Sequence, residues 1–99
     1  MARLDIRRLR GRGRQIVVEL QSDYARDLPT IVVAPIIPVD DLSPYPGINP
    51  RVRVDGIACA VRLDHIVGVA ATRLGDRLGS LLDREFEIDA AINRLLFFV

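Results

Sequence analysis

Only one long stretch of this chain has the composition of a helix, and it comes last, from Asp83 to Val99. Neither proline nor glycine interrupts it, and alanine and leucine, which favour helices, recur along it. Asp83 is expected to cap its start, because an aspartate oxygen can accept the first backbone N–H groups. Its apolar residues recur at three- and four-residue spacing and predict one buried face. They are Ile88, Ala91, Ile92, Leu95 and Val99.

The end of this predicted helix carries more apolar side chains than one face can bury. Every residue from Leu95 to Val99 is apolar. Part of the last turn must therefore be covered by another chain, fold back, or stay exposed, and an exposed apolar cluster commonly marks a contact surface. Two interpretations stay open: a surface for a partner, or a plug in the protein's own core or dimer interface.

The residues before the helix predict short strands joined by turns. Gln15 to Leu20 and Thr30 to Ile37 are rich in β-branched residues, and Pro35 predicts an edge position or a bulge. Asp55-Gly56 is a strong signal for a hairpin turn. Further strands are expected at Ala2 to Leu9, as an edge strand, at Arg51 to Asp55, at Ile57 to Leu63 and at Ile66 to Ala70.

Two segments predict irregular structure. The segment from Pro38 to Pro50 is rich in proline and is expected to be an irregular loop on the surface. The segment from Thr72 to Leu82 contains two glycines and is expected to be a loop with at most one helical turn.

Strands joined by tight turns are largely antiparallel. The expected fold is therefore mainly β (α+β): a small half-open barrel or sheet closed by one C-terminal helix.

The composition fits one folded domain over residues 1–99, with 49% hydrophobic and 27% charged residues. The net charge of +1 argues against a chain that binds polyanions as a whole. Cys59 is the single cysteine, so an internal disulfide is impossible, and we expect a small core residue in a cytoplasmic protein. We expect no signal peptide and no membrane-spanning segment.

The basic residues gather near the start of the chain. All 14 of them are arginine, and six fall within the first fourteen residues, where only Asp5 opposes them. Two interpretations of the Arg10 to Arg14 segment stay open: a mobile loop for an acidic peptide or phosphate, or a solvated hairpin tip. It is not a phosphate-binding loop, because no Gly-Lys-Ser/Thr sequence follows it.

The sequence assembles no active site. His65 is the single histidine, and its neighbour Asp64 points to the opposite face if both lie on a strand. The serines lack a recognisable nucleophile motif, and one histidine with one cysteine does not supply the ligand spacing of a metal site. We therefore expect no catalytic residues, no metal and no cofactor.

Several segments, in their order and spacing, resemble the CcdB toxins of bacterial toxin–antitoxin modules. They are Val18 to Pro35, the hairpin around Asp55-Gly56, Asp83-Arg84-Glu85 and Ala91-Ile92-Asn93. The resemblance covers essentially the whole chain at matching length, and its most specific parts are Leu20-Gln21-Ser22-Asp23 and Ala91-Ile92-Asn93. It implies an SH3-like antiparallel barrel with one C-terminal helix, and a homodimer.

The resemblance also implies a function. CcdB toxins are not enzymes; they bind the dimerisation region of the DNA gyrase A subunit and trap gyrase on cleaved DNA. An antitoxin neutralises them through a disordered acidic segment, and operator DNA is bound only by the pair, which represses its own operon. The implied gyrase contacts are Tyr24, Ala25, Asn93, Phe97, Phe98 and Val99. The implied antitoxin contacts are Arg8, Arg10, Arg12, Arg14, Asp41 and Leu42.

The chain departs from the family pattern at the implied gyrase contacts. Phe97-Phe98-Val99 stand where the family has Trp-Gly-Ile, and Tyr24-Ala25 stand where it has two isoleucines. Phe97 keeps an aromatic ring without the indole donor. Phe98 puts a large side chain where glycine allows close approach, so we expect this change to hinder docking on gyrase.

Two other functions stay open from the sequence. One is a CcdB-like protein that binds an antitoxin and regulates the operon without poisoning gyrase. The other is a ribonuclease of the MazF type, which shares the fold and needs a basic, hydroxyl-bearing groove for RNA. Arginine is abundant here, but the sequence assembles no cleavage site.

Overall fold

The computed structural model describes residues 2–11, 13, 15–41 and 45–97. Within these ranges, seven strands form one antiparallel sheet and a single α-helix, α1 (Glu85–Leu96), follows them. The strands are β1 (Asp5–Leu9), β2 (Ile16–Glu19), β3 (Thr30–Pro38), β4 (Arg51–Val54), β5 (Ile57–Val61), β6 (Val67–Ala70) and β7 (Leu74–Ser80). Short 3-10 turns join them: η1 (Asp23–Ala25), η2 (Val39–Asp41), η3 (Leu63–His65), η4 (Ala71–Arg73) and η5 (Leu82–Arg84).

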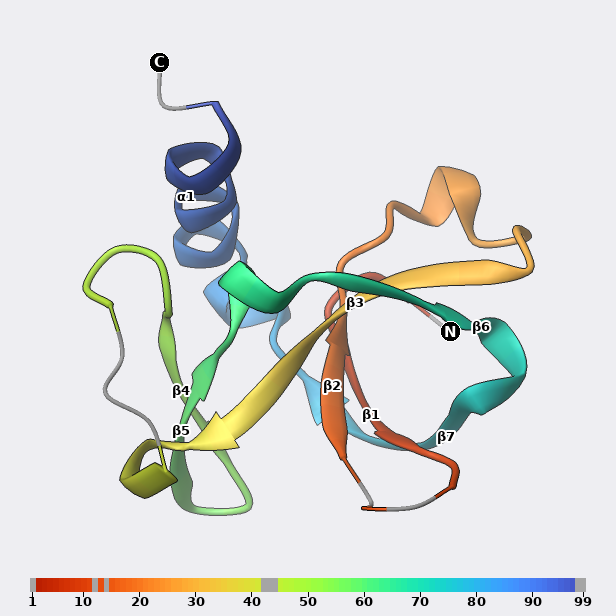
Figure 1. Ribbon diagram of the computed structural model, residues 1–99, viewed down its shortest axis with the longest axis horizontal. Coiled ribbons are helices and arrows are strands. Elements are labelled where there is room, and N and C mark those ends of the chain that lie inside the picture. Colours follow the sequence, from red (N-terminus) through yellow and green to blue (C-terminus); the bar gives the residue numbers. More distant parts are fainter. Residues whose placement is uncertain (1, 12, 14, 42–44, 98–99) are drawn as a thin grey trace.

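The long strand β3 organises the sheet. The strand order is β4-β5-β3-β2-β1-β7, and β6 pairs with β3 outside this path. Residues 30–33 of β3 pair with β6 and residues 36–38 pair with β5. Pro35 lies between these two stretches, where its missing N–H interrupts neither ladder. The sheet curls into a half-barrel with one C-terminal helix, as Figure 1 shows, and the predicted fold class is confirmed.

Two apolar clusters form the core. The larger one lies between the curled sheet and α1, to which the helix contributes Ile88 and Ala91. The smaller one lies among β1, β2, β3, β6 and β7, around Val17, Ile31 and Val33. Cys59 is buried in the larger cluster, as predicted. β-branched residues of the strands supply about half of the buried residues in these clusters.

The helix begins later than predicted and packs only in part. Residues 82–84 form η5, and the residue at the cap position of α1, Arg84, makes no capping hydrogen bond from its side chain. The prediction that Asp83 caps the helix is therefore wrong. The backbone N–H of Leu82 instead donates to Ser80 Oγ at 3.1 Å. The carboxyl-terminal half of α1 projects away from the sheet (Figure 1), so Leu95 is 37% exposed.

The segment predicted to be a loop contains β7, and this changes the place of β1. β7 pairs with β1 along residues 74–80, so β1 lies between β2 and β7 and is not an edge strand. The two glycines of β7 misled the prediction. A Cβ at Gly75 would lie 2.5 Å from the carbonyl oxygen of Arg8, so glycine is needed for the close approach of the two strands.

Gly75→Ala is expected to destabilise the fold by about 1–3 kcal/mol, because the added methyl group collides with backbone that cannot move aside cheaply. Gly79→Ala in the same strand is the matched control. Its Cβ would lie 3.7 Å from Ile6 Cδ1, an ordinary contact. Urea denaturation of both variants measures the difference, and equal stabilities would contradict the close approach of β1 and β7.

The turn between β4 and β5 matches its prediction. Asp55 and Gly56 have φ angles of 50° and 77°, and positive φ at both central residues is the mark of a type I′ hairpin turn.

Along the described part of the chain, no helix is both long and apolar enough to cross a membrane.

Candidate functional site

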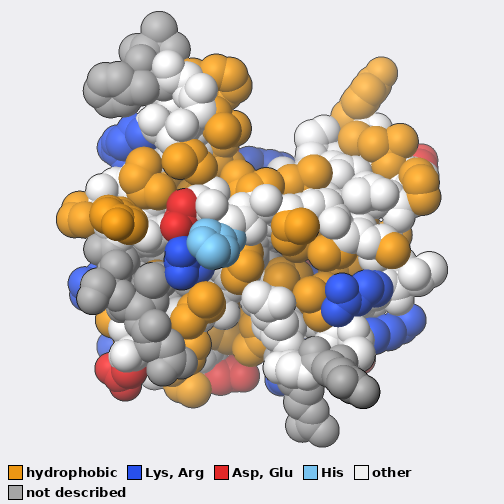
Figure 2. Space-filling view, in the orientation of Figure 1, with side chains coloured by type: hydrophobic (Ala, Val, Ile, Leu, Met, Phe, Trp, Pro, Cys, Tyr) orange, Lys and Arg blue, Asp and Glu red, His pale blue; other side chains and the backbone are white. Residues whose placement is uncertain are grey.

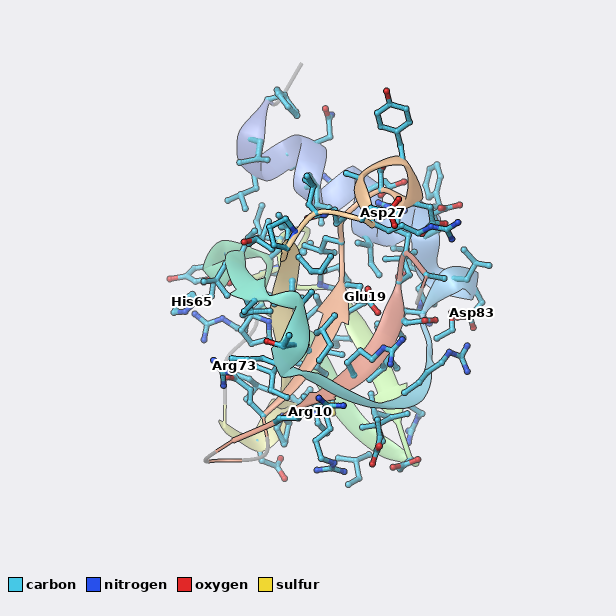
Figure 3. All side chains as sticks on the ribbon, turned by 90° about the vertical axis from the view of Figure 1, so that its right-hand side faces the viewer. Arg10, Glu19, Asp27, His65, Arg73 and Asp83 are labelled. Atoms are coloured by element: carbon cyan, nitrogen blue, oxygen red, sulfur yellow. The ribbon has the colours of Figure 1, made fainter. Side chains whose placement is uncertain are left out.

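The residues implied as gyrase contacts gather at one end of the half-barrel. Tyr24 and Ala25 lie in η1, and Asn93 and Phe97 lie at the end of α1. Figures 1 and 3 show η1 and the last turns of α1 at the same end of the sheet, and Figure 1 shows them well separated. Phe98 and Val99 fall outside the described residues. The structure thus brings two separate parts of the chain to one end.

Hydrogen bonds from side chains hold η1 in place. Ser22 Oγ accepts from the backbone N–H of Tyr24 at 3.1 Å. Gln21 bridges η1 to β3: its Nε2 donates to the carbonyl of Ala25 at 2.7 Å, and its Oε1 accepts from the N–H of Val32 at 2.9 Å. The Tyr24 side chain is fully exposed. A fixed turn therefore presents an aromatic ring to solvent.

Arg3 ties η1 to α1. Its backbone N–H donates to Asp23 Oδ1 at 2.9 Å, and its Nε donates to the carbonyl of Leu20 at 3.2 Å. The same guanidinium group forms ion pairs with Glu85, at 3.0 Å, and with Asp89. The backbone and the side chain of Arg3 together thus link η1 to the first turns of α1, which matters because a binding surface made of two elements needs a constant spacing.

The end of α1 presents apolar side chains to solvent. The N–H of Phe97 donates to the carbonyl of Asn93 at 2.9 Å, so the helical turn continues to this residue. Leu96 and Phe97 are 59% and 68% exposed. Burial of Phe97 in the core of its own subunit, one part of the second interpretation left open, is wrong; a plug in a dimer interface stays a prediction. We call Tyr24, Leu96 and Phe97 the apolar end.

Apolar side chains also cover the face between the two parts of the apolar end. Figure 2 shows hydrophobic side chains from α1 across β6 toward η1. Val67, on β6, is 49% exposed. Scattered apolar residues are normal on a protein surface, but a gathered set commonly marks a contact with another chain.

The residues implied as antitoxin contacts lie at the opposite end. Arg8 is half-buried on β1, and Arg10 is exposed beyond it in the β1–β2 hairpin. Asp41 ends η2, which lies at the same end of the half-barrel in both ribbon views. Arg12, Arg14 and Leu42 fall outside the described residues. The two predicted surfaces therefore occupy different ends of the molecule.

A second arginine, missed by the sequence analysis, lies beside Arg10. The N–H of Arg10 donates to the carbonyl of Arg73 at 2.8 Å, and Arg73 Nη2 donates to the carbonyl of Arg10 at 3.3 Å. Arg10 Nη1 also donates to the carbonyl of Thr72 at 3.2 Å. Figure 3 labels both arginines on the end away from α1. These hydrogen bonds hold the β1–β2 hairpin against η4, and Arg73 thereby joins Arg10 in the basic surface.

His65 and Asp64 do not form a catalytic pair. His65 Nε2 lies 3.8 Å from Asp64 Oδ2, beyond hydrogen-bond distance. The Asp64 carboxylate is instead held by Arg62, at 2.7 and 3.0 Å, and by Asn49 Nδ2 at 2.9 Å. The hydrogen bonds from Arg62 hold the pKa of Asp64 well below its usual range, so this carboxylate is a poor proton acceptor. It anchors the loop before β4.

A buried cluster of charges braces the sheet, and sequence alone did not show it. Arg7 Nε lies 3.0 Å from Glu19 Oε2, and its Nη1 donates to the carbonyl of Gly75 at 3.0 Å. Arg77 Nε lies 3.0 Å from Asp5 Oδ1. Both carboxylates are nearly inaccessible. Burial raises the pKa of Glu19, and Arg7 opposes the rise. Figure 3 shows Glu19 inside the sheet, far from either end.

The chain matches a known protein family over most of its length. The family model described as CcdB protein matches residues 7–97. No curated protein sequence matches the chain significantly.

Several solved structures with the same fold are of toxins and endoribonucleases. Mycobacterium tuberculosis toxin MazF-mt6 has a TM-score of 0.78 and 21% identity over 91% of this chain and 93% of its own. An endoribonuclease in complex with its cognate antitoxin, from a mycobacterial species, has a TM-score of 0.81 and 18% identity over 97% and 94% of the two chains. An endoribonuclease from a mycobacterial species has a TM-score of 0.79 and 15% identity over 97% and 90%. At such identities the likeness concerns the fold alone.

Proposed function

The chain belongs to the CcdB protein family, and from this premise we propose that it is the toxin of a toxin–antitoxin pair whose target is the A subunit of DNA gyrase. The toxin would bind gyrase on cleaved DNA and trap that state. It would act as a homodimer in the cytoplasm, and the pair of toxin and antitoxin would repress its own operon. Family membership supports the toxin role, and the surface of the fold supports the choice of contacts.

The observation that carries this proposal is the apolar end. Tyr24, Leu96 and Phe97 are exposed, although burying them would favour folding. Two independent devices hold them in position: Gln21 fixes η1, and Arg3 ties η1 to α1. Exposed aromatic residues on a fixed scaffold are the side chains that most often anchor a protein interface. In a homodimer, two such ends would engage a two-fold gyrase together.

The end that carries Arg8, Arg10 and Arg73, which we call the basic end, supports an acidic antitoxin as the second partner. Arg10 and Arg73 lie together there, and Arg8 lies two residues before Arg10, on β1. A guanidinium group forms bidentate pairs with carboxylates. Because this end lies opposite the apolar end, antitoxin and gyrase contacts need not coincide. One of the similar structures is an endoribonuclease in complex with its cognate antitoxin.

We propose further that the chain is not an enzyme. The carboxylate next to its single histidine is already held by Arg62 and Asn49. The competing function is a ribonuclease, favoured by the fold that the chain shares with endoribonucleases and by the neighbouring Arg10 and Arg73. Incubating the purified protein with RNA separates the two: we expect intact RNA, and sequence-specific cleavage would overturn the non-enzyme proposal.

A supercoiling assay tests the gyrase proposal. Purified protein added to gyrase and relaxed plasmid is expected to inhibit supercoiling and to leave linear, cleaved DNA after protease treatment. The remaining alternative is a CcdB-like protein that binds its antitoxin and regulates its operon without poisoning gyrase, which the bulk of Phe98 favours. Tight binding of an acidic partner, with supercoiling unaffected, would favour that alternative.

A further inference from the structure

A groove lies at the seam where the half-barrel does not close. β4 and β7 are the two ends of the strand order, and the groove between them has a volume of about 490 Å³. Arg51 and Arg53 of β4 line one wall, and Ser80, Asp83 and Arg84 line the other. Figure 3 places Asp83 at the surface on the side away from His65. We call this groove the seam groove.

The wall formed by β4 exposes backbone hydrogen-bonding groups. In the described part of the chain, β4 pairs with β5 alone. The two-residue turn at Asp55-Gly56 makes Val54 and Ile57 a hydrogen-bonded pair. Because these pairs alternate along an antiparallel ladder, the N–H and C=O groups of Arg51 and Arg53 point away from β5.

A hydrogen bond across the groove confirms this direction. Arg84 Nη2 donates to the carbonyl of Arg51 at 2.7 Å, so this carbonyl faces the seam. It accepts a hydrogen bond from a side chain, whereas within a sheet it would accept one from the backbone N–H of a neighbouring strand. The Nε of Arg84 is buried without a hydrogen-bond partner, which is costly for a charged group. The Arg84 side chain therefore satisfies only part of the hydrogen bonding that a neighbouring strand would give β4.

The charge of the seam groove is positive. Three guanidinium groups line it, from Arg51, Arg53 and Arg84, with the carboxylate of Asp83. Arg84 is already paired with Glu87 at 2.8 Å, so Arg51 and Arg53 supply the positive charge. Arg51 and Arg53 alternate with the buried Val52 and Val54, so their side chains stand on the outer face of β4. An added strand would place alternate side chains beside them on that face.

We propose that an acidic peptide in extended conformation docks in the seam groove as an added strand on β4. Its backbone exchanges hydrogen bonds with Arg51 and Arg53, and its alternate carboxylates pair with their guanidinium groups. The Arg84 side chain releases the Arg51 carbonyl to a peptide N–H. This contact is separate from the apolar end, and it holds whether or not the chain inhibits gyrase.

The backbone and the charge exclude two other occupants. A second copy of the chain, paired through β4 about a two-fold axis, would set arginines opposite arginines, which is destabilising. A nucleic acid would satisfy the guanidinium groups, but it offers no ladder of N–H donors and C=O acceptors to match the exposed edge of β4. A peptide strand supplies both the charge and the ladder.

Peptide binding measured by fluorescence anisotropy tests the proposal. The probe is a short, capped, fluorescent peptide of alternating valine and glutamate. Binding is expected to weaken at least tenfold when alternate backbone nitrogens of the peptide are methylated, because charge is kept and the ladder is lost. An alternating valine and lysine peptide is expected not to bind. A fluorescent oligothymidine of similar charge is expected to bind more weakly than the probe.

The charge-reversed double variant Arg51→Glu and Arg53→Glu is expected to lose at least tenfold in affinity for the probe. Arg26→Glu is the matched control, because Arg26 is an exposed arginine outside both the seam groove and the predicted antitoxin surface. Both sites of the double variant are exposed, so its melting temperature should match that of the unchanged protein.

Hydrogen exchange locates the contact. Saturating probe is expected to slow exchange of the Arg51 and Arg53 amides by about tenfold or more, while the Val52 and Val54 amides, already in the ladder with β5, change little. Three results would each overturn the proposal: equal binding of the methylated peptide, equal binding by the double variant, or binding of the oligothymidine in preference to the probe.

Discussion

Deleting Phe97 to Val99 is expected to weaken binding to the gyrase A subunit by roughly 30-fold or more and to abolish inhibition of supercoiling. Loss of an aromatic anchor from the centre of an interface commonly costs about 2 kcal/mol or more, which corresponds to that factor. Phe97 is 68% exposed and is held by its backbone hydrogen bond to Asn93. The deletion should therefore leave the melting temperature nearly unchanged.

Phe86→Ala is the matched control for this deletion. Phe86 is also an exposed aromatic residue of α1, at 86% exposure, but it lies in the first turn rather than at the apolar end. Its loss is expected to leave supercoiling inhibition within about twofold of the unchanged protein. Equal loss of inhibition in both variants, or full inhibition by the truncated chain, would show that the apolar end does not make the contact.

Arg7→Met is expected to destabilise the protein by about 3–5 kcal/mol. The substitution leaves the Glu19 carboxylate buried without its cation, and removing one partner of a buried ion pair costs this much. It also removes the hydrogen bond to the Gly75 carbonyl. Urea denaturation measures the change, with the exposed Arg26→Met as a control expected to fall within about 0.5 kcal/mol.

The pH dependence of the Arg7→Met variant identifies the buried charge as the cause. Burial already raises the pKa of Glu19, and the loss of Arg7 raises it further. A carboxyl group whose pKa is raised by folding stabilises the folded protein at low pH and loses that contribution as pH rises through the folded pKa. The variant should therefore be more stable at about pH 5 than at about pH 8. The double variant Arg7→Met and Glu19→Gln should lose this slope, and a slope that persists would assign it to another group.

Hydrophobic periodicity predicted most of the fold. The alternation around Asp55-Gly56 predicted β4, β5 and their turn, and the spacing of Ile88 and Ala91 predicted the buried face of α1. The sequence also showed that one helix face cannot bury all of the residues from Leu95 onward, but it left open whether a partner chain or the protein's own core or dimer interface covers them. These features depend on local patterns, which a sequence displays directly.

The missed features depend on contacts between distant residues. β7 was predicted as a loop because glycine is rare in strands, yet Gly75 is needed where β1 approaches. Arg7, Glu19 and Asp5 look like solvated charges in their own segments, and only the pairing of β1 with β2 and β7 brings them together. Arg73 joins the basic end through its backbone pairing with Arg10. No local pattern marks any of these contacts.

The most direct test of the account is a calorimetric titration of the purified chain into the purified gyrase A subunit. The unchanged protein is expected to bind saturably, and binding is expected to be lost on deletion of residues 97–99, with both proteins folded. Failure of the folded, unchanged chain to bind, or binding that survives the deletion, would contradict the assignment of the apolar end as the surface that engages gyrase.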